Sequence, residues 1–175
     1  MKPLTMYLIR HGEKTLDFKR LTKRGKKQAE LLGKRLKKLD IDKIISSDLS
    51  RCVETAKIIN KHLKLKLISF DPRIREINSY DKILFSRCKR KRKSVKEFLK
   101  NILEHEEGNI LVVCHGNVNR YILSLLLEIP PKKAKLVQIP TGVNTIERKR
   151  NGEIKIVTVN DTTHLPEKLK VKQLI

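Results

Sequence analysis

The sequence lacks the features that mark disordered, disulfide-linked and repetitive chains. It has no long Gly, Pro or Ser tract and no internal repeat, and 39% of its residues are hydrophobic. This composition argues against a disordered protein. A chain of 175 residues buries a sufficient core as one domain without disulfides or metal. We therefore expect a single domain over residues 1–175.

Cysteines and long apolar runs are also scarce. Cys52, Cys88 and Cys114 are odd in number and widely spaced, so they predict neither a disulfide framework nor a metal cluster, and a reducing cytosol fits best. No stretch approaches the roughly twenty apolar residues that span a bilayer, and residues 1–3 lead into the first apolar run without a signal-peptide core. We expect a soluble, cytoplasmic protein with no membrane partner. No carboxylate cluster and no His-x-x-x-His pair occurs, so no metal site is predicted.

Acidic residues are few relative to basic ones. The chain has 41 Lys and Arg against 19 Asp and Glu, a formal net charge of +22. Three interpretations stay open: a field that attracts phosphorylated substrates, a nucleic-acid surface, or a lysine-rich composition without specific meaning. The densest run, residues 87–93, has no interleaved aromatics, which a stacking surface for single-stranded nucleic acid needs. The run is either a solvated loop and helix start or part of a small basic lid around residues 77–107.

An apolar run over residues 6–9 ends on Arg10, His11 and Gly12. The run is typical of a buried strand in a parallel sheet. In open α/β sheets ligands bind outside the carboxyl ends of the strands, which is where Arg10 and His11 would emerge. Gly12 permits a tight turn or a close approach to a ligand. Taken alone, the motif is also compatible with a plain polar strand end.

A second apolar run, residues 110–114, ends on His115 and Gly116. Two strands that both finish in His-Gly are hard to ascribe to packing, and a parallel sheet would place both imidazoles at one edge. A helical pattern begins at Asn117, so its free amides and positive dipole end provide a further anion site. Cys114 is a candidate thiol nucleophile, but strand alternation directs its side chain away from that of His115.

Periodicity and capping residues outline the other elements. A helix follows the N-cap Thr22, and a second follows residues 47–50, whose side chains are expected to cap it. The remaining expected elements are strands at 43–46 and 65–69, an amphipathic helix at 95–103, and a hairpin of 143–147 and 154–159 around Asn151-Gly152. The predicted fold class is α/β, a three-layer α/β/α sandwich with a mostly parallel sheet and a C-terminal antiparallel hairpin.

Four segments of the chain resemble the histidine phosphatase superfamily, which includes the cofactor-dependent phosphoglycerate mutases. They are Arg10-His11-Gly12-Glu13, residues 46–56 (SSDLSRCVETA), residues 113–117 (VCHGN) and residues 160–165 (NDTTHL). The segments stand in family order and reach from one end of the chain to the other. The short connection at residues 14–20 resembles the compact members, among them the phosphohistidine protein phosphatases.

The resemblance implies a set of roles. His11 is the nucleophile, Arg10, Arg51, His115 and Gly116 bind the phosphoryl group, and His115 also counts among the catalytic residues. Neither a metal nor a cofactor is implied. A cation such as Arg51 in a first helical turn is disfavoured by the macrodipole, so a functional reason is sought, although a solvated arginine is the alternative.

Glu76 occupies the place of the acid that protonates the leaving group in the family. The Gly- and Trp-containing sequence that often follows in the family is replaced by residues 79–81 (SYD). Neighbouring arginines are expected to lower the pKa of Glu76, whereas an effective acid needs it raised. A surface carboxylate paired to Arg73 or Arg75 is the alternative interpretation.

These residues predict a metal-independent phosphatase that hydrolyses phosphomonoesters through a phosphohistidine on His11. The expected partner is a small phosphorylated substrate or a phosphoprotein. The alternatives are a phosphoglycerate mutase-type phosphoryl transfer, a phosphohistidine or phosphotyrosine protein phosphatase, and a nucleic-acid-binding module on a degenerate phosphatase fold. The sequence fixes neither the substrate nor the oligomeric state.

Overall fold

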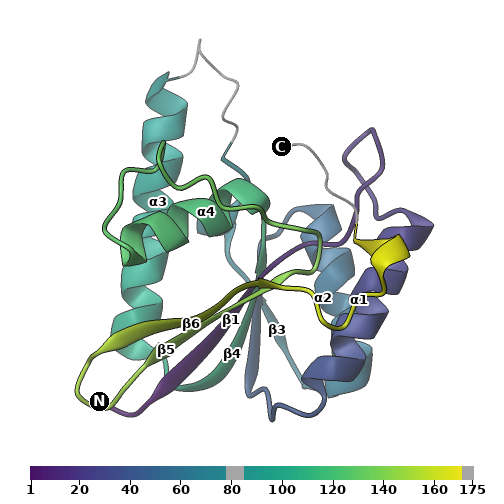
Figure 1. Ribbon diagram of the computed structural model, residues 1–175, viewed down its shortest axis with the longest axis horizontal. Helices are drawn as coiled ribbons and strands as arrows, with labels where there is room; N and C mark the ends of the chain where they lie inside the picture. The colour runs from purple at the N-terminus through teal and green to yellow at the C-terminus, as the bar shows by residue number, and fades with distance from the viewer. Residues whose placement is uncertain (78–84, 171–175) are drawn as a thin grey trace.

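A computed structural model describes residues 1–77 and 85–170 of the chain (Figure 1). The strands are β1 (Leu4–Arg10), β2 (Lys43–Ser46), β3 (Ile68–Phe70), β4 (Gly108–Cys114), β5 (Val143–Arg148) and β6 (Ile154–Asp161). The helices are α1 (Lys23–Leu36), α2 (Ser50–Leu63), α3 (Phe85–His105) and α4 (Gly116–Leu126), with short 3-10 turns η1 (Pro72–Ile74) and η3 (Glu167–Leu169). No helix in the described part of the chain combines the length and apolarity that crossing a membrane requires.

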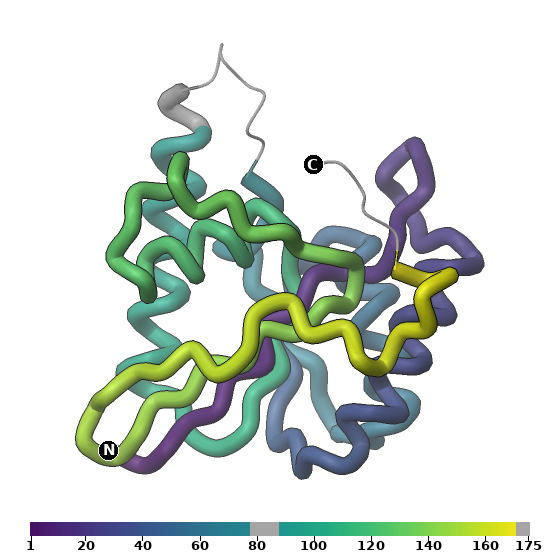
Figure 2. The backbone as a smooth tube through the Cα atoms, viewed as in Figure 1, coloured from purple at the N-terminus to yellow at the C-terminus, as the bar shows by residue number. Residues whose placement is uncertain are grey.

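The six strands form one sheet in the order β3-β2-β4-β1-β5-β6. The first four are parallel to one another, β5 pairs antiparallel with β1, and β6 pairs antiparallel with β5. β1 and β4 lie side by side in the middle of the sheet (Figure 2), and their register pairs Arg10 with Cys114. The next residues, His11 and His115, therefore leave the sheet at the same level. The amide of His11 donates to the Cys114 carbonyl at 2.9 Å, which fixes that level.

Helices cover both faces of the sheet, with α1 and α2 on one side and α3 and α4 on the other (Figure 1). Each face has its own apolar cluster. Phe98 of α3 and Ile122 of α4 belong to the first, and Leu32 of α1 and Ile59 of α2 belong to the second. The central strands are apolar on both faces because both are covered. The predicted three-layer sandwich and the C-terminal hairpin are confirmed.

Two local predictions were wrong. The strand expected at 65–69 begins only at Ile68, because both backbone groups of Leu65 bond to the side chain of Asn60, at 3.0 Å each, in the turn that ends α2. The side-chain cap expected for α2 is missing: Leu49 is the N-cap residue and makes no side-chain cap hydrogen bond. The Asp48 carboxylate bonds to Arg75, and the Ser47 hydroxyl contacts His115 as well as accepting from the Leu49 amide at 3.4 Å.

The basic lid expected around residues 77–107 stays a prediction. Residues 78–84 of it lie outside the described part of the chain. Within the rest, Val95, Phe98, Leu99 and Ile102 of α3 are buried, so the second half of this segment forms core.

Candidate active site

His11 lies just past the end of β1 and is buried, with 1% of its surface exposed. Its Nδ1 is 2.7 Å from the Gly12 carbonyl oxygen, so the hydrogen is assigned to Nδ1 and the lone pair to Nε2. Burial, followed by the charge of Arg10, holds the pKa of His11 well below its usual range, and Arg51 and Lys14 add to this. The ring is therefore neutral at physiological pH, with a lone pair on the site-facing nitrogen for attack.

A glycine is required at position 12 because the main chain there lies very close to the start of α1. A side-chain carbon there would lie 2.6 Å from the Gly25 carbonyl oxygen at the start of α1, a distance that forces the backbone to shift. The neighbour that excludes a side chain is thus the helix rather than a ligand. Thr22 caps that helix through a 2.9 Å bond from the Gly25 amide, as predicted, and Glu13 accepts from the Thr22 hydroxyl. Glu13 thereby ties the loop after His11 to α1.

His115 follows β4 and is fully buried. Its ring centroid lies 5.3 Å from that of His11, in an edge-to-face arrangement. Nε2 is 3.0 Å from the Ser47 hydroxyl and 3.5 Å from the Cys52 sulfur. Burial, followed by the neighbouring His11 and Arg51, holds the pKa of His115 well below its usual range. The predicted convergence of the two imidazoles is confirmed.

Arg51 bridges the two rings from the first turn of α2. Its Nε donates to His11 Nε2 at 3.1 Å, and its Nη2 lies 3.2 Å from His115 Nδ1. Both ring nitrogens that face the site are thus contacted by one guanidinium, so the alternative of a solvated arginine is wrong. A forked cation between two site-facing nitrogens is placed to bind oxygens of a tetrahedral anion.

Arg10 is buried at the end of β1, with 5% of its surface exposed. Its Nη1 donates to the Gln138 carbonyl at 2.6 Å, and the Gln138 amide in turn donates to Asn144 at 3.1 Å. The Arg10 carbonyl accepts from the Thr141 amide at 2.9 Å. The Thr141 hydroxyl lies 3.2 Å from Nε2 of His164. The C-terminal segment that resembles the family's tail therefore packs behind Arg10.

Glu76 reaches the site from the segment after η1. Its Oε2 lies 3.9 Å from His115 Nδ1, and 22% of its side chain is exposed. Lys91 of α3 donates to the Glu76 carbonyl at 2.6 Å, and Asn117 of α4 donates to the Ile77 carbonyl at 2.8 Å. The main chain at Glu76 is thus held by helices on one face of the sheet.

The arginines beside Glu76 point to other carboxylates. Arg73 pairs with Asp71 at 2.6 Å, and Arg75 pairs with Asp48. The alternative of a surface ion pair for Glu76 is therefore wrong.

Burial rather than the neighbouring charges decides the direction of the Glu76 pKa shift. Burial raises its pKa despite the opposing charges of Arg51 and Arg10 and hydrogen bonds from the Ile77 and Asn117 amides. Desolvation outweighs these charges because the carboxyl lies within the site. A raised pKa keeps the proton that a general acid must give.

Three further cations act on residues of the site, and none of them was named individually from the sequence. Lys14 interacts electrostatically with Arg51, Arg10 and Glu76, and burial lowers its pKa. Lys91 acts on His115, and Arg120 acts on Arg10. In a chain with 41 basic residues, no local signal distinguishes these three.

Two thiols lie close to the site but are poor nucleophiles. Burial raises the pKa of Cys52 and that of Cys114 well above the usual range. The Cys114 sulfur lies on the far face of the strand, 2.7 Å from Asn119, as strand alternation predicts. Neither thiol is ionised to a useful extent near neutral pH.

Gly116 is buried and is the first residue of α4. Its predicted phosphate contact stays a prediction. Within residues 1–77 and 85–170, no three His, Cys, Asp or Glu side chains are grouped so that they could hold a metal ion. The positive charge of the site comes from arginine and lysine side chains.

Comparison with known proteins yields both sequence relatives and similar structures. Pgam5 of Caenorhabditis elegans, named a mitochondrial serine/threonine-protein phosphatase, is 32% identical over 92% of this chain, which spans 64% of that protein's length. A phosphoglycerate mutase structure from Plasmodium falciparum superposes with a TM-score of 0.70 at 26% identity and covers 95% of this chain and 96% of that one. A phosphoserine phosphatase structure from Entamoeba histolytica reaches 0.74 at 23% identity, over 93% and 100% of the two chains, which shows the fold.

The family model of the histidine phosphatase superfamily, branch 1, matches residues 6–82 and 87–162. The matched ranges contain every residue that the structure gathers around the two imidazoles. The chain belongs to the histidine phosphatase superfamily.

Proposed function

We propose that the protein is a metal-independent phosphatase that hydrolyses phosphomonoesters through a phosphohistidine at Nε2 of His11. One observation carries the proposal: the Arg51 guanidinium contacts the site-facing nitrogens of both His11 and His115. Two neutral rings, a buried arginine at the end of β1 and a carboxyl with a raised pKa provide a nucleophile, anion ligands and an acid in one place.

The reaction proceeds in two displacements. Arg10 and Arg51 bind the phosphoryl oxygens and stabilise the charge of the transition state. Nε2 of His11 attacks phosphorus in line, a P–N bond forms, and the P–O bond to the leaving group breaks. Glu76 gives its proton to the departing oxygen. Water then attacks the phosphohistidine, Glu76 accepts a proton from it, and inorganic phosphate leaves as the P–N bond breaks.

His115 donates to the phosphoryl group through Nδ1. This requires the hydrogen on Nδ1, and the Ser47 hydroxyl permits it because a hydroxyl both accepts from and donates to Nε2. An anion in the site favours that tautomer. Ser47 is thus a positioning residue for His115.

Replacing His11 tests the proposal. His11→Asn should reduce hydrolysis of p-nitrophenyl phosphate by about 10⁴-fold or more, as expected for loss of a nucleophile. His105→Asn is the matched control, because His105 is exposed at the end of α3, and it should retain wild-type rates. Near-normal activity in His11→Asn would refute the proposal.

A mutase is the second candidate, since a solved structure of similar fold is a phosphoglycerate mutase. We prefer the phosphatase because the connection between β1 and α1 is short and its tip is exposed, so it encloses an intermediate poorly. Bisphosphate-dependent isomerisation of phosphoglycerate, faster than phosphate release, would reverse this preference.

A cytoplasmic location is proposed because Cys52 and Cys114 are buried thiols without a disulfide, which suits a reducing compartment. Fractionation of cells that express a tagged full-length protein tests it. Recovery with mitochondria, the location in the name of the nematode relative, would overturn it.

A further inference from the structure

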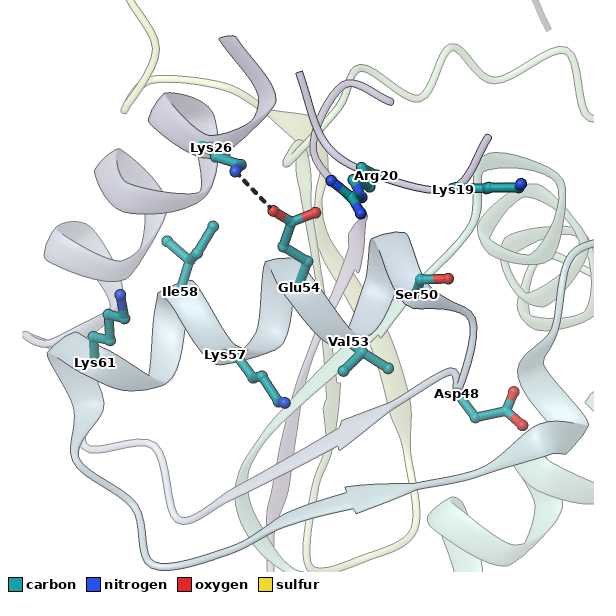
Figure 3. Close-up of a pocket in the computed structure, with 10 residues that line it drawn as sticks. All are labelled: Lys19, Arg20, Lys26, Asp48, Ser50, Val53, Glu54, Lys57, Ile58 and Lys61. Atoms are coloured by element: carbon teal, nitrogen blue, oxygen red, sulfur yellow. Dashed lines mark ion pairs between the residues drawn. The ribbon is translucent and has the colours of Figure 1, made fainter. Parts of the chain in front are cut away.

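A groove of about 900 Å³ follows the outer face of α2 (Figure 3). Its basic side chains come from three segments: Lys19 and Arg20 from the connection after His11, Lys26 from α1, and Lys57 and Lys61 from α2. The two rings and the two arginines of the catalytic site do not line it. The groove is therefore a separate surface with a strong positive charge.

The carboxylates in the groove are already paired. Glu54 contacts Lys26 at 3.2 Å and accepts from the Leu21 amide at 2.8 Å, and Asp48 pairs with Arg75. Figure 3 shows Lys26 reaching across to Glu54.

Unlike Lys26, the other four cations of the groove are not paired with a carboxylate in the described part of the chain. Within the part of the chain that the structure describes, Lys19, Arg20, Lys57 and Lys61 form no ion pair. All four are exposed. Their charges are thus available to an anionic partner.

One end of the groove lies next to the catalytic site along α2. Ser50 lines it, and the next residue is Arg51, which contacts both imidazoles. From Ser50 to Lys61 the helix rises by about 16 Å, the span of about five residues of extended peptide. A peptide with its phosphorylated residue at Arg51 would place residues up to about five positions away beside Lys57 and Lys61.

The lining favours a peptide over nucleic acid. Val53 and Ile58 are half-buried between the lysines and offer apolar contact to a peptide chain. No aromatic residue is among the lining side chains, so base stacking has no platform.

We propose that this groove binds an acidic segment flanking the phosphorylated residue of a phosphoprotein substrate. The inference rests on the proposed phosphatase function and names its substrate class. It makes Lys57 and Lys61 determinants of KM rather than of the chemical step.

The test compares two phosphoserine peptides of one sequence, with either Glu or Gln at two to five positions from the phosphoserine, alongside p-nitrophenyl phosphate. Wild type should show a KM about tenfold lower for the acidic peptide, as expected for two exposed ion pairs, and the preference should shrink as salt increases. Lys57→Glu with Lys61→Glu should remove it. Hydrolysis of p-nitrophenyl phosphate and kcat on the Gln peptide should stay unchanged.

Lys96→Glu with Lys100→Glu is the control, because it inverts two exposed charges at the same spacing on α3, one of which, Lys100, has a long 3.8 Å contact with Glu104. It should change KM by less than about twofold. An equal loss in this control would reduce the effect to net charge and overturn the proposal. Thermal melts of both double variants verify folding.

The two proposals fail differently. Hydrolysis of p-nitrophenyl phosphate without any acidic preference would overturn the groove and leave the phosphatase standing. Absent hydrolysis would refute the phosphatase, and anisotropy of a labelled acidic peptide would then report on the groove alone. Tighter binding of duplex DNA than of that peptide, lost in Lys57→Glu with Lys61→Glu, would assign the groove to nucleic acid and overturn the proposal.

Discussion

β1 and β4 lie side by side and are followed by the same dipeptide, His-Gly, yet their two histidines are held by opposite nitrogens. His11 is fixed at Nδ1 by its own main chain, at Gly12, and turns Nε2 toward the site. His115 is fixed at Nε2 by Ser47 and turns Nδ1 toward the site. The main-chain carbonyl can only accept, whereas the hydroxyl can donate or accept. The two His-Gly motifs therefore have different roles, because the ring nitrogen that faces away from the site has a different partner in each.

The strongest test of this comparison removes one ring and follows the intermediate. In His115→Asn, turnover should fall by about 10² to 10³-fold, because one preorganised donor is lost, but a phosphoenzyme should still form. Its phosphate should be on Nε2 of His11, as shown by NMR of the alkali-denatured protein. Phosphorylation of His115 in the wild type would invert the assigned roles.

Glu76→Gln is expected to have the next largest effect. Loss of the proton donor should slow hydrolysis of an alkyl phosphate by about 10²-fold. An aryl phosphate should be affected less in the first step because its leaving group needs little protonation, and phosphoenzyme should accumulate since the base for water is also gone. Rapid-quench measurements of both substrates verify this. Equal losses on the two substrates, without accumulation, would remove Glu76 from the acid role.

The pH profile should follow the two opposite pKa shifts. His11 must be neutral, and its lowered pKa keeps activity as pH falls until well below 6.5. Glu76 must be protonated, and its raised pKa keeps activity as pH rises past the usual range for a carboxyl. Lys14→Met should move the acid limb of kcat/KM to higher pH, because a cation near His11 is lost, whereas Lys23→Met should not. An unmoved limb would contradict the electrostatic account.

Ser47→Ala should have the smallest effect. Loss of one buried hydrogen bond corresponds to about 1 kcal/mol, or about fivefold in kcat. The effect should be confined to kcat, with a wild-type melting temperature to within a few degrees. Ser94→Ala is the control, because the hydroxyl of Ser94 bonds to the Arg90 carbonyl of its own helix, α3. A loss in KM alone would show that Ser47 does not orient the ring.

Much of the fold followed from the sequence. The apolar runs that stop before His11 and His115 predicted where two strands end. Parallel pairing of these strands then predicted that both histidines lie at the same edge of the sheet. Asn151-Gly152 marked the hairpin, and Gly152 has the positive φ of 86° that such a turn requires.

The features that the sequence did not predict depend on contacts between distant segments of the chain. Ser47 and Asp48 look like helix caps, but both side chains also bond to distant partners, His115 and Arg75. The direction of the Glu76 shift needed the balance of burial against charge, which neighbours in sequence do not report. The selection of Lys14, Lys91 and Arg120 likewise needed coordinates.

The bond from Lys91 to the main chain at Glu76 separates the machinery into two mechanical parts. The nucleophile follows a strand of the sheet, whereas the acid lies in the segment after η1, whose main chain is held by α3 and α4. A shift of α3 along its axis would therefore move the main chain at Glu76 and change how well Glu76 protonates different leaving groups. Both imidazoles would stay in place.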